Sequence, residues 1–508
     1  MTTAAEPGVL SFEQACEAVR EYCVQIRTVD GGRPPQTEEV PLLQALGRIL
    51  AEPVLADRDF PPFPRATRDG YAVRASDLTT IPVMLRVVGQ VRAGDSYDLP
   101  VLPGEAVEIM TGAAVPEGAD TVIMIEHTSI KSVGPDNKQS AGEDTGTAAS
   151  DNKHENVISN APDAVDGEDI LGMIDVVVDR DTGGNEAEKQ TDDYVEIQRS
   201  VTAGENIVPV GAEAKAGQEM LTAGLRLGPP QIAMAAAAGK ARIHVYRRPR
   251  VAILSTGDEL VEVAENPGPH QIRNSNSYSL AAQVAVWGGE PVQLPIAPDE
   301  ASKLVTLMET GLAADMLLLS GGVSMGKFDL VEQEITSLGA EFFFTGVLIQ
   351  PGRPVVFGEV KRSGENNGKS DARPHSQAEG AGNLGASHPA ETALEKKTPF
   401  FGLPGNPISA MVTFDLFARP VLEALSGAVP VRLPTAKARL RKDFKAKTGL
   451  TRFIPAILEG GLSDPEVEAI AWQGSGDVLA SARANCYLVV PPDRALLAAG
   501  EMVSVVLR

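Results

Sequence analysis

The chain has 508 residues and a formal net charge of −23, with 43% hydrophobic and 22% charged residues. This acidic balance argues against a nucleic-acid partner, because nucleic acids are bound through clustered Lys and Arg. No apolar run approaches the length that spans a membrane, and the first ten residues lack the basic start and apolar core of a signal peptide. We therefore expect a cytoplasmic protein without a membrane partner, with room for three or four domains.

Cysteine and histidine usage excludes several kinds of site. The three cysteines, Cys16, Cys23 and Cys486, form no CxxC pair, and the first two lie on the apolar face of a predicted helix. The six histidines are scattered without the spacing of zinc ligands. A histidine-based metal site or a Ser-His-Asp triad is therefore not expected.

The N-terminal part is predicted to belong to an elongated α+β region. Residues 1–55 form its helical and linker part, in which Ser11 and Gln14 have the spacing of a capping box before an amphipathic helix. Residues 196–248 are predicted to return to this region and to include an Ala-rich helix at 231–238.

Residues 56–195 are predicted to form a small β-module, in which Asp69-Gly70 is a tight-turn signal. Its strands are expected at 71–73, 81–91 and 106–109. Within it, residues 131–193 hold 16 acidic and 5 basic residues and no Phe, Trp or Tyr. Such a segment buries too little apolar surface to offset its ordering entropy, so we predict a disordered insertion in which only 170–178 is strand-like. A partner-docking role is the alternative.

Residues 249–430 are predicted to form an α/β domain. Apolar runs alternate there with helical patterns, which indicates a parallel-rich sheet covered on both faces. The runs lie at 250–254, 315–319, 354–360 and 398–403, and the helical patterns at 277–287, 300–311 and 330–338. Residues 362–397, rich in Gly, Ser, Ala, Glu and Lys, are interpreted as a second flexible insertion. Residues 431–508 show short strands and Gly-rich turns, which predicts a C-terminal all-β domain.

Polar loops follow the apolar runs of the α/β domain. Ligands of such sheets bind outside the carboxyl ends of the strands, and carboxylates gathered there favour a hard cation such as Mg2+. The carboxylates in question are Asp258, Glu259, Asp299 and Asp329. Helix capping is an alternative for two of them, because Asp299 precedes a predicted helix and Asp329 has a capping-box partner in Glu332.

The loop at 404–409 contains two prolines around Gly-Asn and lies between a predicted strand and a helix expected at 410–425. Such a rigid loop is predicted to aim N–H groups and the Ser409 hydroxyl at an anion beside the helix N-terminus. A plain strand-to-helix turn is the alternative.

Seven motifs occur in one order along the chain. They are DGYAV at 69–73, IMTGA at 109–113, GENI at 204–207, STGDEL at 255–260, SGGVSMGKFD at 320–329, PGRP at 351–354 and LPGNPIS at 403–409. This ordered set resembles the molybdopterin molybdenumtransferases, the MoeA family. The resemblance implies a MogA-like three-layer α/β domain, an elongated N-terminal region with its β-module, and the C-terminal β-domain. It also implies insertion of molybdenum from molybdate into adenylylated molybdopterin, with release of AMP.

The resemblance further implies roles for particular residues and a homodimer whose β-module faces the α/β domain of the other subunit. The catalytic set is Asp69, Thr111, Glu259, Asp299 and Asp329, of which Glu259, Asp299 and Asp329 would bind Mg2+. The substrate-binding set is Asp258, Ser320, Gly321, Gly322, Ser324, Pro351, Gly352, Arg353, Pro354, Pro404, Gly405, Asn406, Pro407 and Ser409. For Asp69 and Thr111, simple turn positions are the alternative.

Two positions depart from the family pattern. Lysine commonly stands on both sides of the Pro-Gly pair in the family, whereas this chain has Gln350 and Arg353. We therefore expect weaker anion attraction at Gln350 and a gain from Gln350→Lys. Arg68 also precedes Asp69, where members often carry Met.

A non-catalytic molybdopterin-binding scaffold and a molybdopterin adenylyltransferase are the rival functions, and an adenylyltransferase is also a candidate partner that supplies the substrate.

Overall fold

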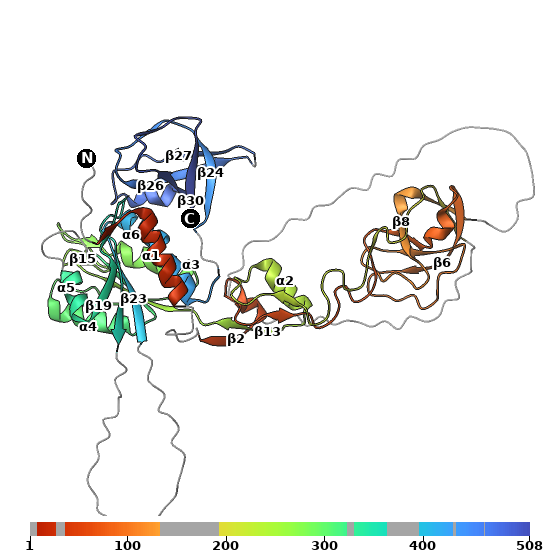
Figure 1. Cartoon of the computed structure of the whole chain (residues 1–508), viewed down its shortest axis with the longest axis horizontal. Helices are drawn as coiled ribbons and strands as arrows, with labels where there is room; N and C mark the ends of the chain where they lie inside the picture. Colours follow the sequence, from red (N-terminus) through yellow and green to blue (C-terminus); the bar gives the residue numbers. More distant parts are fainter. Residues whose placement is uncertain are drawn as a thin grey trace, which may run out of the picture. The chain divides into compact units, whose positions relative to one another are not determined.

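The computed structural model describes residues 8–26, 36–132, 193–322, 330–362, 396–429, 433–461 and 463–508 (Figure 1). The chain divides into two compact units. One comprises Met1–Asp57 with Gly217–Arg508, and the other comprises Arg58–Ala216. The predictions for residues 170–178, Ser324, Asp329 and most of both insertions lie outside the described residues.

The unit Arg58–Ala216 is built around a six-stranded sheet in the order β8-β5-β7-β6-β10-β9. Its strands are β5 (Gly70–Val73), β6 (Val83–Val91), β7 (Glu105–Ile109), β8 (Thr121–Met124), β9 (Thr128–Ser132) and β10 (Asp193–Ile197). The three predicted strands are therefore confirmed. The ladder between β9 and β10 pairs Ser132 with Asp193, so the strands extend into the segment predicted as an insertion. Main-chain pairing continues there because it depends little on side-chain composition.

The N-terminal residues of the other unit form short two-stranded sheets. β2 (Thr37–Pro41) pairs with β13 (Arg242–Tyr246), and β3 (Val54–Leu55) pairs with β12 (Glu219–Leu221). The predicted Ala-rich helix is α2 (Pro229–Ala237), which begins with Pro at its first turn. Its buried side joins a small apolar core with these strands.

Helix α1 (Phe12–Gln25) has the predicted capping box between Ser11 and Gln14. It packs on the α/β domain, where Ala15, Val19 and Tyr22 enter the main core. This differs from the prediction that residues 1–55 all belong to the elongated region. An apolar stripe shows that a helix buries one face, but it does not identify what covers that face.

The α/β domain contains a mixed, mainly parallel sheet in the order β17-β14-β18-β23-β22-β19. Its strands are β14 (Arg250–Ser255), β17 (Glu290–Gln293), β18 (Met316–Ser320), β19 (Ala340–Phe344), β22 (Val356–Arg362) and β23 (Lys396–Leu403). The first four of the sheet are parallel, whereas β22 runs antiparallel to both neighbours. The pairing of β22 with β23 reaches Arg362 and Lys396, so these residues belong to strands and not to the predicted insertion.

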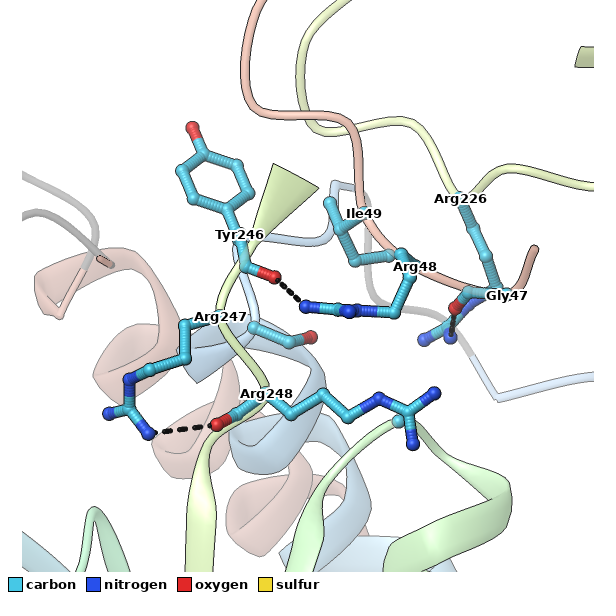
Figure 2. A pocket seen from close by; sticks show the side chains of 9 residues that line it. Gly47, Arg48, Ile49, Arg226, Tyr246, Arg247 and Arg248 are labelled. Atoms are coloured by element: carbon cyan, nitrogen blue, oxygen red, sulfur yellow. Dashed lines mark hydrogen bonds between the residues drawn. The ribbon is translucent and has the colours of Figure 1, made fainter. Parts of the chain in front are cut away.

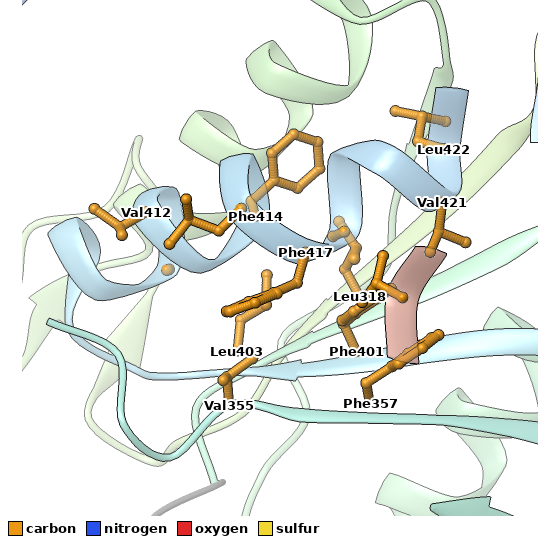
Figure 3. Close-up of a cluster of buried hydrophobic side chains, with 14 of the residues drawn as sticks. Leu318, Val355, Phe357, Phe401, Leu403, Val412, Phe414, Phe417, Val421 and Leu422 are labelled. Carbon is orange, nitrogen blue, oxygen red and sulfur yellow. The ribbon is translucent and has the colours of Figure 1, made fainter. Parts of the chain in front are cut away.

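Helices cover both faces of this sheet. The helices are α3 (Ser275–Val286), α4 (Ala301–Leu312), α5 (Leu330–Ser337), α6 (Pro407–Thr413), the π-helix η4 (Phe414–Ala418) and α7 (Arg419–Leu425). Alternate residues of β18 face opposite layers: Leu318 joins the core under α3, α6 and α7, and Leu317 joins the core under α4 and α5. Figure 3 shows the first core, in which Phe357 stacks on Phe401 with ring centroids 4.4 Å apart. The predicted three-layer architecture is confirmed.

The C-terminal residues form the predicted β-domain. Its sheet has the order β21-β26-β27-β24-β30-β28, and an additional pairing of β26 with β28 closes it. The strands are β21 (Ile349–Gln350), β24 (Thr435–Leu440), β26 (Thr451–Gly460), β27 (Pro465–Ala469), β28 (Cys486–Val490) and β30 (Met502–Leu507), with one short helix, α8 (Val478–Arg483). Phe453 and Tyr487 extend from this domain into the main α/β core. No helix among the described residues is both long and apolar enough to cross a membrane.

Candidate functional site

A cleft of about 690 Å³ lies at the carboxyl ends of the parallel strands. Loops that follow β14, β18 and β23 form it together with the loop before α4 and the start of β22. Its lining residues are Thr256, Gly257, Glu259, Ile272, Asp299, Leu304, Gly321, Gly322, Leu330, Val331, Gln333, Pro354, Pro404, Gly405 and Asn406. The cleft therefore lies at the edge of the sheet where the sequence predicted it.

Main-chain hydrogen bonds fix the loops around the cleft. The Thr256 N–H donates to the Ser320 carbonyl at 3.0 Å, and the Gly321 N–H donates to the Leu403 carbonyl at 3.3 Å. Gly321 has φ +94°, and a Cβ at this position would lie 2.6 Å from the Thr256 carbonyl oxygen. Only glycine allows this close approach of two site loops.

Two carboxylates, Glu259 and Asp299, line the cleft, and Asp258 stands beside them. The Asp258 carboxylate accepts the Asp299 N–H at 3.1 Å. Partial burial raises the pKa of Asp299, and the neighbouring charges of Asp258 and Glu259 raise it further. The capping interpretation of Asp299 is wrong, because Glu300 is the N-cap of α4 and makes no side-chain cap hydrogen bond.

The carboxylates of Asp258, Glu259 and Asp299 are ligand types that suit a hard divalent cation. Carboxylate oxygens are the preferred ligands of Mg2+, and a cation between Glu259 and Asp299 would relieve their mutual repulsion. Among the described residues, no group of three Asp, Glu, His or Cys side chains is arranged to hold a metal. The third predicted ligand, Asp329, lies outside that part of the chain.

The loop between β23 and α6 differs in detail from the prediction. Asn406 is the N-cap of α6, so the helix begins at Pro407, three residues earlier than expected. Ser409 lies inside the first turn with 4% exposure and does not line the cleft. The Ile408 N–H is occupied, because it donates to the carbonyl of Ser475 at 2.9 Å. The helix start that the prolines favour therefore places Ser409 in the buried first turn of α6 and not in the loop before it.

The Pro-Gly-Arg-Pro loop connects β21 to β22. Because β22 is antiparallel to β23, Val356 pairs with Gly402 and the loop reaches the same edge of the sheet as the strand ends. Pro351 and Gly352 are buried, Arg353 is exposed, and Pro354 lines the cleft.

The structure places a cation beside Gln350 that the sequence did not show, and the expected weaker anion attraction at this position stays a prediction. The Gln350 Oε1 accepts the Nε–H of Arg452 at 2.8 Å. Arg452 comes from β26 of the C-terminal domain and is 8% exposed, and its Nη1 also donates to the Leu450 carbonyl at 3.2 Å. A guanidinium thus already stands beside Gln350.

Sequence reasoning missed Asn276, which connects two of the site loops. Its Nδ2 donates to the Ser320 Oγ at 2.9 Å and to the Gly405 carbonyl at 2.7 Å. Its Oδ1 is buried and has no hydrogen-bond partner among the described residues. The available signal was a polar side chain on the buried face of α3, two residues after Asn274, the N-cap.

Asp69 and Thr111 lie together in the unit Arg58–Ala216. The Thr111 N–H donates to the Asp69 Oδ1 at 2.6 Å, and both residues are exposed. Hydrogen bonds from the Thr111 main chain and side chain lower the pKa of Asp69. Asp69 is therefore held as an accessible carboxylate.

A second concavity, shown in Figure 2, is lined by four arginines: Arg48, Arg226, Arg247 and Arg248. Its volume of about 10 Å³ holds at most about one water molecule. Arg48 donates to the Tyr246 carbonyl at 2.8 Å, and Arg226 donates to the Gly47 carbonyl at 2.8 Å. These arginines join main-chain segments, so we assign this concavity to the framework of the fold.

Taken together, the fold and the cleft define a multidomain protein whose three-layer α/β domain holds a ligand-sized cleft at its strand ends. The family models "MoeA N-terminal region (domain I and II)", "Probable molybdopterin binding domain" and "MoeA C-terminal region (domain IV)" match residues 10–239, 252–424 and 437–507. The chain belongs to the MoeA family.

Individual relatives agree with this membership. A molybdopterin molybdenumtransferase of a Nostoc species is 31% identical and covers 92% of this chain and 88% of its own length. One from Bacillus subtilis is 29% identical over 97% of this chain and 93% of its own length. The crystal structure of a molybdopterin biosynthesis MoeA protein from Pyrococcus horikoshii aligns with a TM-score of 0.66 at 25% identity, covering 98% of this chain and all of that one.

Proposed function

We propose that this protein is a molybdopterin molybdenumtransferase. It would insert molybdenum from molybdate into adenylylated molybdopterin and release AMP. The observation that carries the proposal is the cleft at the strand ends, which Glu259 and Asp299 line together with the loop that contains Pro404, Gly405 and Asn406. The names and near full-length similarity of the Nostoc and Bacillus relatives support the same activity.

Glu259, Asp299 and Asp329 are proposed to hold Mg2+. When bound, the ion supplies positive charge that offsets repulsion between molybdate and the pyrophosphate of the substrate. Gly321 and Gly322 let the main chain approach the substrate closely, since neither presents a side chain to the cleft.

Molybdate is proposed to bind at the Pro-Gly-Arg-Pro loop. Arg353 is exposed there, next to the cleft residue Pro354. Its planar guanidinium suits a tetrahedral oxyanion, because it can donate two parallel hydrogen bonds. Ser409 is a weaker candidate than the sequence suggested, since it is buried in α6.

A homodimer is part of the proposal. The exposed side of α3 supports it: none of the 12 residues of this helix is charged, and Tyr278 and Val286 are 48% and 73% exposed. An uncharged, partly apolar helix face is typical of a subunit interface. In such a dimer, the partner's β-module would present the Asp69 carboxylate to the cleft. A molybdopterin adenylyltransferase would supply the substrate in the cytoplasm.

The test is AMP release from adenylylated molybdopterin with molybdate and Mg2+, measured for the wild type, Asp299→Asn and Glu300→Gln. Glu300 is the matched control, because it is an exposed neighbouring carboxylate that pairs with Lys303 on the surface. We expect loss of at least about 100-fold in activity for Asp299→Asn and near wild-type activity for Glu300→Gln.

Other outcomes identify the rival functions. Binding of the substrate without AMP release by the wild type indicates a scaffold. Consumption of ATP and molybdopterin with release of pyrophosphate indicates the adenylyltransferase. Either result overturns the proposal.

A further inference from the structure

The C-terminal β-domain contacts both loops that flank the cleft. On one side, β21 is parallel to β26, with Gln350 opposite Arg452, and the Thr451 N–H donates to the Leu348 carbonyl at 3.1 Å. Strand β21 leads directly into the Pro-Gly-Arg-Pro loop. On the other side, the Ser475 carbonyl accepts the N–H of Ile408 in the first turn of α6.

The second contact depends on a tight turn at residues 473–477. Asp477 holds this turn, because its Oδ2 accepts the Gln473 N–H at 3.0 Å and its Oδ1 accepts the Ala480 N–H at 3.1 Å. The Asp477 N–H also donates to the Gly474 carbonyl at 3.1 Å, and Gly474 has φ +113°. The position of the Ser475 carbonyl therefore follows from the Asp477 carboxylate.

This carbonyl matters for the cleft because of where Ile408 lies. Ile408 comes directly after Pro407, and the preceding residues Pro404, Gly405 and Asn406 form one wall of the cleft. The first N–H groups of a helix have no partner within the helix, so an outside acceptor fixes the direction in which the helix starts. The Ser475 carbonyl supplies that acceptor.

We infer that the C-terminal β-domain is the positioning element of the molybdate site, and that Asp477 is its positioning residue. Asp477 does not line the cleft. It holds the 473–477 turn, the turn holds Ile408, and Ile408 fixes the wall formed by residues 404–406. This inference rests on the proposed function for its kinetic part, but its structural part can be tested alone.

The experiment compares the wild type, Asp477→Ala, Asp477→Ser and Asp443→Ala. Asp477 is the N-cap of α8, and a serine at this position can still accept one hydrogen bond. Asp443 is the matched control, because its carboxylate also accepts a loop N–H of the same domain, that of Ala499 at 2.7 Å, beside the paired strands Phe444–Lys445 and Leu496–Leu497. Hydrogen exchange of the peptide that contains Ile408 is measured first, and the KM for molybdate and the kcat of AMP release follow.

We expect Asp477→Ala to speed hydrogen exchange at Ile408. It should also raise the KM for molybdate by about five-fold, which corresponds to the free energy of one lost helix-capping hydrogen bond. The kcat should change by less than about two-fold. Asp477→Ser should restore most of both values, and Asp443→Ala should match the wild type. Unchanged exchange at Ile408 in Asp477→Ala overturns the inference, as does an equal effect of Asp443→Ala. If the wild type releases no AMP but exchange at Ile408 still responds to Asp477→Ala, the proposed function fails and the structural link stands.

Discussion

Replacement of Gln350 by Lys tests whether the structure or the family pattern predicts the behaviour of the Pro-Gly-Arg-Pro loop. The family pattern predicts tighter molybdate binding, because a cation is added. The structure predicts a less stable protein, because Gln350 Oε1 accepts the Arg452 Nε–H at 2.8 Å. Lysine removes this acceptor and brings a second positive charge next to a guanidinium that is 8% exposed.

The magnitude follows from two contributions. Two unit charges about 4 Å apart repel by roughly 4 kcal/mol at an effective dielectric constant near 20. Position 350 is exposed, so a flexible lysine turns toward solvent and only about 1 kcal/mol of that repulsion remains. Loss of a hydrogen bond from a charged donor adds about 1.5–3 kcal/mol. We therefore expect the free energy of unfolding to fall by about 2.5–4 kcal/mol.

The assay is urea unfolding followed by tryptophan fluorescence. Trp472 is a suitable reporter, because it packs against both the α/β core and the core of the C-terminal domain. Gln350→Glu is the matched variant: it keeps an acceptor for Arg452 and should be as stable as the wild type or more stable by up to about 1 kcal/mol. A Gln350→Lys protein that is as stable as the wild type and needs less molybdate would refute this reasoning.

Three further changes test other parts of the site and the core. Asn276→Asp removes the donor to the Gly405 carbonyl and places a carboxylate oxygen against it. We expect the free energy of unfolding in urea to fall by about 2–3 kcal/mol, and to fall less for Asn276→Ser. Equal stability of the two variants would count against the role of the amide. Gly321→Ala places a Cβ 2.6 Å from the Thr256 carbonyl oxygen, on a residue whose φ is +94°. The rate of AMP release should therefore fall at least about ten-fold. Normal activity of this variant would show that the loop is not fixed. Burial raises the pKa of Asp415. This carboxyl therefore stabilises the folded state at low pH, and that contribution is lost as pH rises through its folded pKa. Asp415→Asn should gain stability relative to the wild type as pH increases, and a difference in unfolding free energy between the two proteins that stays constant from pH 4 to 8 would contradict this sign.

Much of the fold was predictable because strands and helices of the α/β domain differ clearly in pattern. The continuous apolar run of β18 and the glycines that follow it predicted a buried parallel strand with a loop at its carboxyl end. The capping box of Ser11 and Gln14 predicted the start of α1 correctly, since it depends only on neighbours in sequence. The partner of α1 could not be predicted, because several apolar surfaces of the chain could cover the same stripe.

The parts of the site that sequence could not give depend on contacts between distant residues. Gln350 and Arg452 are 102 positions apart, and Asn276 and Gly405 are 129 apart. A missing lysine at position 350 was visible in the sequence, but the hydrogen bond from the Arg452 guanidinium of another domain to Gln350 was not. Asn276 was not recognised from the sequence, and only the fold shows that its amide joins Ser320 and the Gly405 carbonyl.

The charge of the cleft explains why its two flanking loops matter together. Glu259 and Asp299 make one side of the cleft negative, and the whole chain carries a formal charge of −23, so Coulomb repulsion opposes an oxyanion at that side unless a cation is bound. The Pro-Gly-Arg-Pro loop, with Arg353 exposed next to the lining residue Pro354, contributes positive charge, and the start of α6 contributes the positive end of a helix dipole. A dianion can be held in such a cleft only at a defined distance from the carboxylates, because the attraction and the repulsion are both steep at a few ångströms. That requirement gives a physical reason for the two loops on the positive side to be fixed to a separate β-domain through Gln350 and Ile408, instead of being left as free connections between a strand and its neighbour.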